Sequence, residues 1–261
     1  MLVVMNDFSP EWLALREPAD TDARADELLT TLRTSLTSRD LLVRDLGSGT
    51  GAMARWLSAR LPGSQKWILT DRDQKLLEVA ASSVPNAMPD LRDLTTITSH
   101  DLVGTSLVTG SALLDILTSA EVTALAEACV GARCPALFTL SVVGQVELTP
   151  ADPLDEQLTA AFNAHQRRTV GGRKLLGPSA VPTIATAFLR LGATVHRRPS
   201  PWRLGPAQSE LTAEWLRGWV SAACEQDPDL KQVADEYLTR RLAEEDLHVI
   251  VHHEDLLAIP S

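Results

Sequence analysis

The amino-acid sequence predicts an α/β fold, a doubly wound parallel sheet covered by helices on both faces. Short apolar runs alternate with stretches of helical periodicity from Leu41 to Val143, and this alternation is typical of parallel strands joined by right-handed crossovers. The runs are continuously apolar, as in strands buried on both faces. A glycine-rich loop follows the first run and leads into a helix, as in many nucleotide-binding sheets.

The order of the elements follows from where each run ends. The first strand is predicted at 41–43, and the helix after it, 52–61, ends at Pro62-Gly63, because proline cannot continue a helix. Further strands are expected at 66–70, 94–98, 107–113, 135–143, 193–196 and 247–251, and further helices at 74–81, 120–129, 152–168, 178–191 and 213–245.

Composition limits the classes of partner. The 261 residues are 44% hydrophobic, enough for one sizeable core, and the formal net charge of −10 opposes binding to a phosphate backbone, so no nucleic acid is expected. Three cysteines without a CxxC pair indicate reduced thiols. No apolar run approaches the roughly 20 residues of a membrane span, and the first residues lack a basic leader region. We therefore expect no membrane partner and a cytoplasmic protein.

The segment from Asp45 to Gly51 is the most informative, and it fits two cofactor classes. Gly47, Gly49 and Ala52 formally satisfy the G-x-G-x-x-G/A pattern that holds a pyrophosphate at a helix N-terminus. That interpretation predicts an NAD(P)-dependent oxidoreductase. However, Asp45 lies two residues before the first glycine, where it would repel a diphosphate and would suit a cofactor that carries an ammonium and a sulfonium.

The same segment, Asp45-Leu46-Gly47-Ser48-Gly49-Thr50-Gly51, resembles motif I of class I S-adenosylmethionine (SAM)-dependent methyltransferases, a D/E-x-G-x-G-x-G pattern. The resemblance implies a Rossmann-like, seven-stranded sheet whose last strand is antiparallel, with helical cap insertions. It also implies SAM as cofactor and S-adenosylhomocysteine as product. In these terms residues 1–40 form an N-terminal helical lid segment, and 41–261 form the SAM-binding domain with insertions at about 150–177 and 205–245.

The resemblance extends to two more acidic positions. Asp71 ends the second predicted strand, where the family places the acid that binds the ribose hydroxyls, and Asp101 follows the third, where the family's acid contacts the adenine amine. Each aspartate could instead only cap the next helix. The candidate cofactor residues are Asp45, Gly47, Ser48, Gly49, Thr50, Gly51, Asp71, Arg72, Asp101, Leu102 and Ser111.

A more particular resemblance concerns the runs at 12–20, 162–168 and 201–204, which are similar to an actinobacterial group of such methyltransferases. It implies a small-molecule methyl acceptor without identifying it. Ser111 to Asp115 lacks the Asn-Pro-Pro-Tyr-type motif of amino-directed DNA and protein methyltransferases. This absence argues against nucleic-acid bases and glutamine side chains as acceptors. An oxygen acceptor is our first hypothesis and nitrogen the second. A SAM-binding protein without turnover is a further alternative.

The candidate catalytic residues are His165, whose ordinary pKa lies near neutrality, and Asp115, which follows the fourth strand. A surface histidine and a helix-capping aspartate are the alternatives. Arginine would recognise an anionic acceptor and tryptophan a planar one, and on that basis the candidate substrate residues are Trp12, Arg16, Asn163, Arg167, Trp202 and Arg203. Because adjacent strand residues point to opposite faces, His252-His253 predicts no metal site. The sequence leaves the oligomeric state open, a homodimer included.

Overall fold

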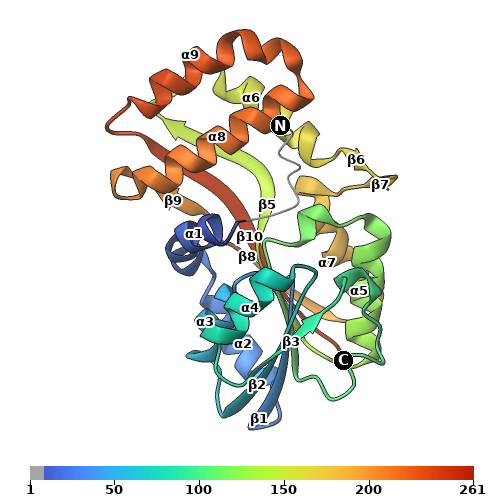
Figure 1. Ribbon diagram of the computed structural model, residues 1–261. Coiled ribbons are helices and arrows are strands. Elements are labelled where there is room, and N and C mark those ends of the chain that lie inside the picture. Colours follow the sequence, from blue (N-terminus) through green and yellow to red (C-terminus); the bar gives the residue numbers. More distant parts are fainter. Residues whose placement is uncertain (1–8) are drawn as a thin grey trace.

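The computed structural model describes residues 9–261 and has a central mixed sheet (Figure 1). Its strand order is β3-β2-β1-β4-β5-β10-β8, with β9 paired to β10. Neighbouring strands from β3 to β5 are parallel, and β10 is antiparallel to both β5 and β8. This confirms the predicted doubly wound sheet and its antiparallel last strand. The strands are β1 Asp40–Leu46, β2 Ser64–Asp71, β3 Ala87–Leu91, β4 Leu107–Ser111, β5 Ala136–Thr149, β8 Thr194–Pro199, β9 Trp202–Leu204 and β10 His248–Ile259.

Two layers of helices cover the sheet, because alternate residues of each central strand point to opposite faces. Leu107 and Leu257 face one layer, whereas Val108 and Leu256 face the other. The first layer consists of α2 Glu27–Ser35, α3 Ala52–Ser58 and α4 Gln74–Ser83, and the second of α5 Ser119–Gly131 and α7 Ala180–Arg190. The order of the strands reverses between β1 and β4, and open α/β sheets bind ligands at the carboxyl end of such a reversal.

The predicted third strand at 94–98 is wrong. The strand β3 lies earlier, at Ala87–Leu91, and Leu94–Thr96 is a 3₁₀ helix capped by Asp93. Two features hid β3 from a search for buried apolar runs. It is an edge strand with several exposed side chains, and it contains Pro89, which only an edge strand tolerates.

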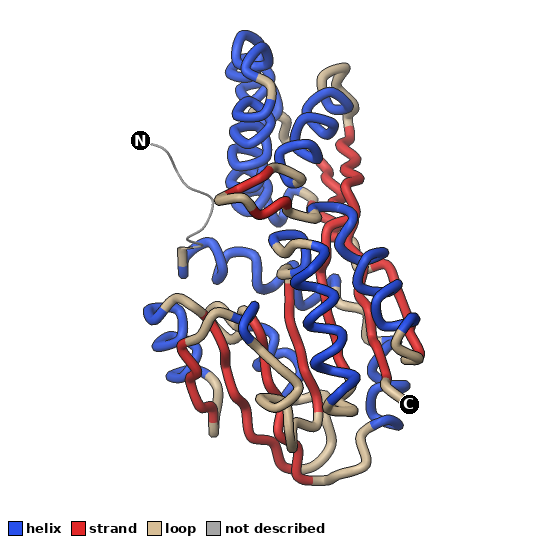
Figure 2. The backbone as a smooth tube through the Cα atoms, turned by 90° about the vertical axis from the view of Figure 1, so that its right-hand side faces the viewer, coloured by secondary structure: helices blue, strands red, loops and turns tan. Residues whose placement is uncertain are grey.

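A cap stands on the sheet, built on two long strands. β5 and β10 continue past the sheet and carry the helices α6 Asp155–Gln166, α8 Ser209–Gln226 and α9 Lys231–Leu242 (Figure 2). These helices share a separate apolar core around Trp219 and Tyr237. A short hairpin, β6 Thr169–Val170 and β7 Arg173–Lys174, follows α6.

The helix α1, Pro10–Ala23, lies between the cap and the sheet (Figure 1). Ser9 caps its first turn, with Pro10 at the first helical position, which is an ordinary helix start. Within residues 9–261, no helix is long and apolar enough to cross a membrane.

Candidate functional site

A cavity of about 370 Å³ opens where the strand order reverses, at the carboxyl ends of β1, β2 and β4. Its size lies in the usual range of small-molecule sites. It brings together ten of the residues predicted from the sequence: Asp45, Gly47, Ser48, Gly49, Thr50, Asp71, Arg72, Ser111, Asp115 and Arg16. Further walls come from α1, from the segment after β3 and from the β6–β7 hairpin.

The glycine loop is held in a left-handed backbone that suits glycine. Gly47, Gly49 and Gly51 have φ values of +61°, +52° and +86°. A Cβ on Gly47 would lie 2.9 Å from Leu113, and one on Gly51 would lie 2.9 Å from Val84. Gly51 therefore serves the packing of the loop against α4, and it does not line the cavity.

Asp71 fixes the loop to the end of β2. Its Oδ2 accepts a hydrogen bond from the Gly49 N–H at 2.8 Å, and its Oδ1 accepts one from the Asp73 N–H at 3.0 Å. Each carboxylate oxygen can accept a second bond. Asp71 can thus hold the loop and still accept two hydrogen bonds from a ligand.

Asp45 is buried, with 1% of its surface exposed. Oδ1 accepts a hydrogen bond from Thr109 Oγ1 at 2.7 Å, but Oδ2 has no partner in the described part of the chain. Burial raises the pKa of Asp45 to about 6, against the opposing effects of the Thr109 hydrogen bond and the charge of Arg24. A buried carboxylate oxygen without a hydrogen-bond donor is energetically costly.

Arg24, which was absent from the sequence predictions, is the complementary group. It comes from the end of α1, is 4% exposed, and packs on the Trp56 ring. Nη2 donates to Ser111 Oγ at 3.2 Å, whereas the buried Nη1 has no partner among residues 9–261. Burial lowers the pKa of Arg24, and the charges of Asp20, Asp255 and, to a smaller extent, Asp45 oppose that shift. The cavity thus contains a buried anion and a buried cation, each with one unsatisfied atom.

Asp93 also lines the cavity, with Leu94 and Thr95, directly after β3. Its carboxylate accepts from the Thr95 N–H at 2.9 Å and from Thr95 Oγ1 at 2.7 Å. Sequence reasoning missed it because the third strand was placed too late. The signal was present, since Asp93-Leu94 is the same dipeptide as Asp101-Leu102.

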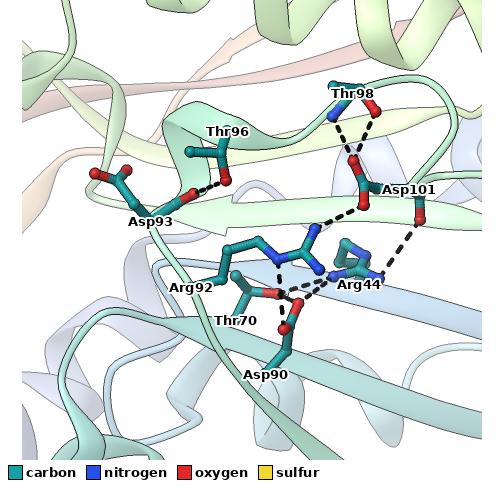
Figure 3. Close-up of polar contacts among 8 residues, drawn as sticks. All are labelled: Arg44, Thr70, Asp90, Arg92, Asp93, Thr96, Thr98 and Asp101. Carbon is teal, nitrogen blue, oxygen red and sulfur yellow. Dashed lines mark hydrogen bonds and ion pairs between the residues drawn. The ribbon is translucent and has the colours of Figure 1, made fainter.

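Asp101 and Leu102 do not line the cavity. Figure 3 shows the Asp101 carboxylate directed at Thr98 and Arg92, with an ion pair of 2.6 Å to Arg92 Nη1. Hydrogen bonds from Thr98 and Arg92 lower the pKa of Asp101. Leu102 is fully buried in the core. In the structure, Asp101 closes the loop back to Thr98, and no helix follows it that it could cap.

Asp115 faces the other part of the cavity, on the 3₁₀ helix Leu114–Ile116 after β4. Burial raises its pKa to about 6, opposed by a hydrogen bond to its own backbone N–H and by the charges of Arg16 and Arg168. A carboxyl group with that pKa is mostly ionised at neutral pH and can take a proton from a ligand.

His165 lies outside the cavity lining. It is 4% exposed, and its Nε2 is 3.1 Å from Glu225 of α8, while its Nδ1 is 3.2 Å from Arg168. Burial and the charge of Arg168 lower the pKa of His165. We assign it to packing between α6 and α8 and to support of Arg168.

The other candidate substrate residues also lie outside the cavity lining. Trp202 is buried, donates from Nε1 to Asp20 Oδ1 at 2.9 Å, and packs under Arg16. Asn163 donates to the Gly144 carbonyl at 2.7 Å. The remaining three are Trp12 against the cap core and the exposed Arg167 and Arg203.

No cluster of His, Cys, Asp and Glu within residues 9–261 could hold a metal ion. His252 pairs with Glu147 at 2.7 Å, whereas His253 is buried against Trp202. The two histidines therefore lie in different surroundings, as their adjacent places on β10 predict.

The strand order and the cavity at the β1–β4 reversal define the methyltransferase fold, and solved structures share it. The cyclopropane synthase MmaA2 from Mycobacterium tuberculosis is similar with a TM-score of 0.52 and 13% identity, over 97% of this chain and 95% of that one. A protein from Bacillus halodurans C-125, itself proposed to be a methyltransferase, is similar with a TM-score of 0.50 and 13% identity, over 89% of this chain and 99% of that one. No protein-family model matches the sequence, and no curated protein matches it.

Proposed function

We propose that this protein is a SAM-dependent methyltransferase that methylates an oxygen or a nitrogen of a small molecule. The observation that carries the proposal is the pair of buried opposite charges at the glycine loop, Asp45 and Arg24, each with an unsatisfied atom. A free amino acid presents an ammonium and a carboxylate on one carbon. The methionine portion of SAM would give its ammonium to Asp45 Oδ2 and its carboxylate to Arg24 Nη1.

The charge pair argues against the dinucleotide alternative. A pyrophosphate on the glycine loop would lie beside Asp45, whose carboxylate is already destabilised by burial. It would supply no donor to Oδ2. The interpretation as an NAD(P)-dependent oxidoreductase therefore does not explain the buried carboxylate of Asp45, which is the most costly group of the site.

The adenosine portion fits the other end of the cavity. Asp71 has free acceptor positions for two ribose hydroxyls, in the role that the family resemblance implies. The resemblance also implies an acid and a following backbone N–H at the adenine. We assign these roles to Asp93 and Leu94, because they border the cavity.

When bound, SAM supplies an electrophilic methyl group on its sulfonium. The residues of this chain would then orient the acceptor and remove its proton. Of the two candidate catalytic residues, Asp115 borders the cavity and His165 does not, and a pKa of about 6 suits a general base. α1, with Leu13 and Arg16 in the wall, would cover the ligand as the proposed lid.

Calorimetric titration with SAM, S-adenosylhomocysteine, NADH and NADPH tests the proposal. We expect micromolar binding of the first two compounds and none of the nicotinamide cofactors. Asp45→Ala should abolish detectable binding, whereas Asp101→Ala, an acid outside the cavity, should preserve it. Binding of NADH or NADPH without binding of SAM would overturn the proposal. SAM binding with no transfer to any acceptor would favour a SAM-binding protein without turnover.

A further inference from the structure

Three arginines of the cavity wall, Arg16, Arg168 and Arg173, differ in their partners. Arg173 forms a double hydrogen bond with Glu121, at 2.9 and 2.7 Å, and Arg16 forms one with Asp20, at 2.9 and 3.1 Å. Both guanidinium groups are therefore neutralised by a carboxylate.

Arg168 is different. Its hydrogen bonds run from Nη1 to His165, at 3.2 Å to Nδ1 and 3.0 Å to the carbonyl oxygen, and it pairs with no carboxylate in the described part of the chain. His165 thus orients the guanidinium group without neutralising its positive charge. A planar cation in this state is suited to two-point recognition of a carboxylate or a phosphate.

Asp115 lies in the same part of the cavity. Its ionisation responds to the charges of Arg168 and Arg16, yet it forms an ion pair with neither. The Asp115 carboxylate and the Arg168 guanidinium therefore border the same space without forming an ion pair. Leu117, Val170 and Leu175 supply an apolar wall beside them.

Gln166 adds a second unsatisfied group. It lines the cavity at the end of α6, and its Oε1 is buried without a hydrogen-bond partner among residues 9–261. This oxygen can only accept a hydrogen bond, so a ligand group that reaches it after a side-chain rotation would be a hydroxyl or an amine.

We propose that the methyl acceptor is a small oxyanion, a carboxylate or phosphate held by Arg168, that carries a hydroxyl or amine toward Asp115 on an apolar body. This inference rests on the proposed function and names the substrate class of the same site. In the transfer, a lone pair of the acceptor oxygen or nitrogen forms the bond to the methyl carbon. The carbon–sulfur bond breaks, its electron pair stays on sulfur, and the acceptor proton passes to the Asp115 carboxylate and then to water.

The test uses the full chain saturated with S-adenosylhomocysteine and three probes, benzoate, phenyl phosphate and benzamide. Calorimetry should detect benzoate or phenyl phosphate, and the tighter of the two identifies the anion. Neutral benzamide, which has the shape of benzoate, should bind at least tenfold more weakly. Arg168→Gln should weaken the anionic probe at least tenfold, and Arg168→Lys should give an intermediate loss.

Arg167→Gln is the matched control, because Arg167 is the neighbouring arginine but is exposed and outside the cavity. It should bind all probes as the wild type does. Equal binding by wild type and Arg168→Gln, equal binding of benzoate and benzamide, or binding of neither anion would overturn the inference. Loss of S-adenosylhomocysteine binding in Arg168→Gln would also overturn it, by placing Arg168 in the cofactor site.

The two proposals fail separately in this design. Absence of S-adenosylhomocysteine binding to the wild type contradicts the proposed function. Normal binding of that compound without an Arg168-dependent anion contradicts only the substrate class. Thermal unfolding of each variant shows whether a loss of probe binding reflects a loss of folding.

Discussion

Asp71 accepts the Gly49 N–H at 2.8 Å, and through this bond the end of β2 holds the glycine loop that follows β1. The two residues are 22 positions apart in the chain and belong to parallel neighbours in the sheet. The acid that faces the cavity therefore also fixes the backbone of the loop. Asp71→Ala would therefore remove both the loop contact and the proposed ribose contact.

We expect Asp71→Ala to weaken binding of S-adenosylhomocysteine by about 1–3 kcal/mol, the usual cost of leaving buried hydrogen-bonding groups unpaired. Asp71→Asn keeps an oxygen that can accept the Gly49 N–H and should lose less. Calorimetric titration of the three proteins gives the comparison. Wild-type affinity in Asp71→Ala would remove Asp71 from the ribose site.

Asp93 and Asp101 provide a direct test of the shifted assignment. Asp93→Ala should weaken S-adenosylhomocysteine by about 1 kcal/mol, because Asp93 borders the cavity and a lost hydrogen bond costs about that much. Asp101→Ala should leave the affinity unchanged, since its carboxylate is directed at Thr98 and Arg92. The reverse pattern would restore the assignment made from the sequence.

The pH dependence of stability should report the buried Asp45. Its folded pKa of about 6 lies above the ordinary value of 3.8, so its contribution to stability is complete below about pH 4 and is lost as the pH rises to about 6. Above pH 6, Asp45→Asn should be more stable than wild type by up to about 3 kcal/mol, at about 1.4 kcal/mol per pKa unit.

Urea unfolding of the ligand-free proteins at pH 4.5, 6 and 8 measures this difference. Asp115, whose pKa is also raised to about 6, is present in both proteins and cancels in the comparison. If the difference in unfolding free energy between wild type and Asp45→Asn does not change with pH, ionisation of Asp45 does not destabilise the folded protein.

Asp255 should be the most sensitive structural acid. Its carboxylate accepts the Leu140 N–H at 2.7 Å and the Ala25 N–H at 2.9 Å, and thereby joins β5, β10 and the start of α2. Asp255→Ala should cost about 3–5 kcal/mol of unfolding free energy, because each buried donor left unpaired costs about 1–3 kcal/mol.

The neighbouring Glu254 is the control for Asp255. It forms an exposed pair with Arg197, and such pairs contribute under about 1 kcal/mol. Glu254→Gln should therefore unfold at nearly the wild-type urea concentration. Equal losses in the two variants would contradict the assigned role of Asp255.

The parts of the site that were predictable from the sequence are local. Asp45 lies near the end of β1, just before the glycine loop, and Asp71 is the last residue of β2, so that a short apolar run and a polar ending were enough to place them. β3 escaped because an exposed edge strand has no such apolar pattern. The misplaced strand then put the predicted adenine acid at Asp101 instead of Asp93, the residue that we propose for this role.

Arg24 could not be found in the same way. Its contacts with Ser111 and Thr139 span 87 and 115 residues, and nothing in the neighbouring sequence marks the residue as buried. The sequence also could not distinguish the arginines that line the cavity from those that do not. Only the folded chain shows that Arg168 borders the cavity and has no carboxylate partner among residues 9–261, whereas Arg167 next to it is exposed.

The continuity of β5 and β10 determines how ligands exchange. Their pairing extends from His248 opposite Thr149, beneath the cap helices, to Ala258 opposite Ala136, inside the sheet. Swinging the cap away as a rigid body would break this ladder of backbone hydrogen bonds. We therefore expect ligand exchange to depend on smaller parts of the cavity wall, such as the hairpin of the two-residue strands β6 and β7. We expect the rate of turnover to depend on local opening of that hairpin and of α1, while the cap helices stay in place.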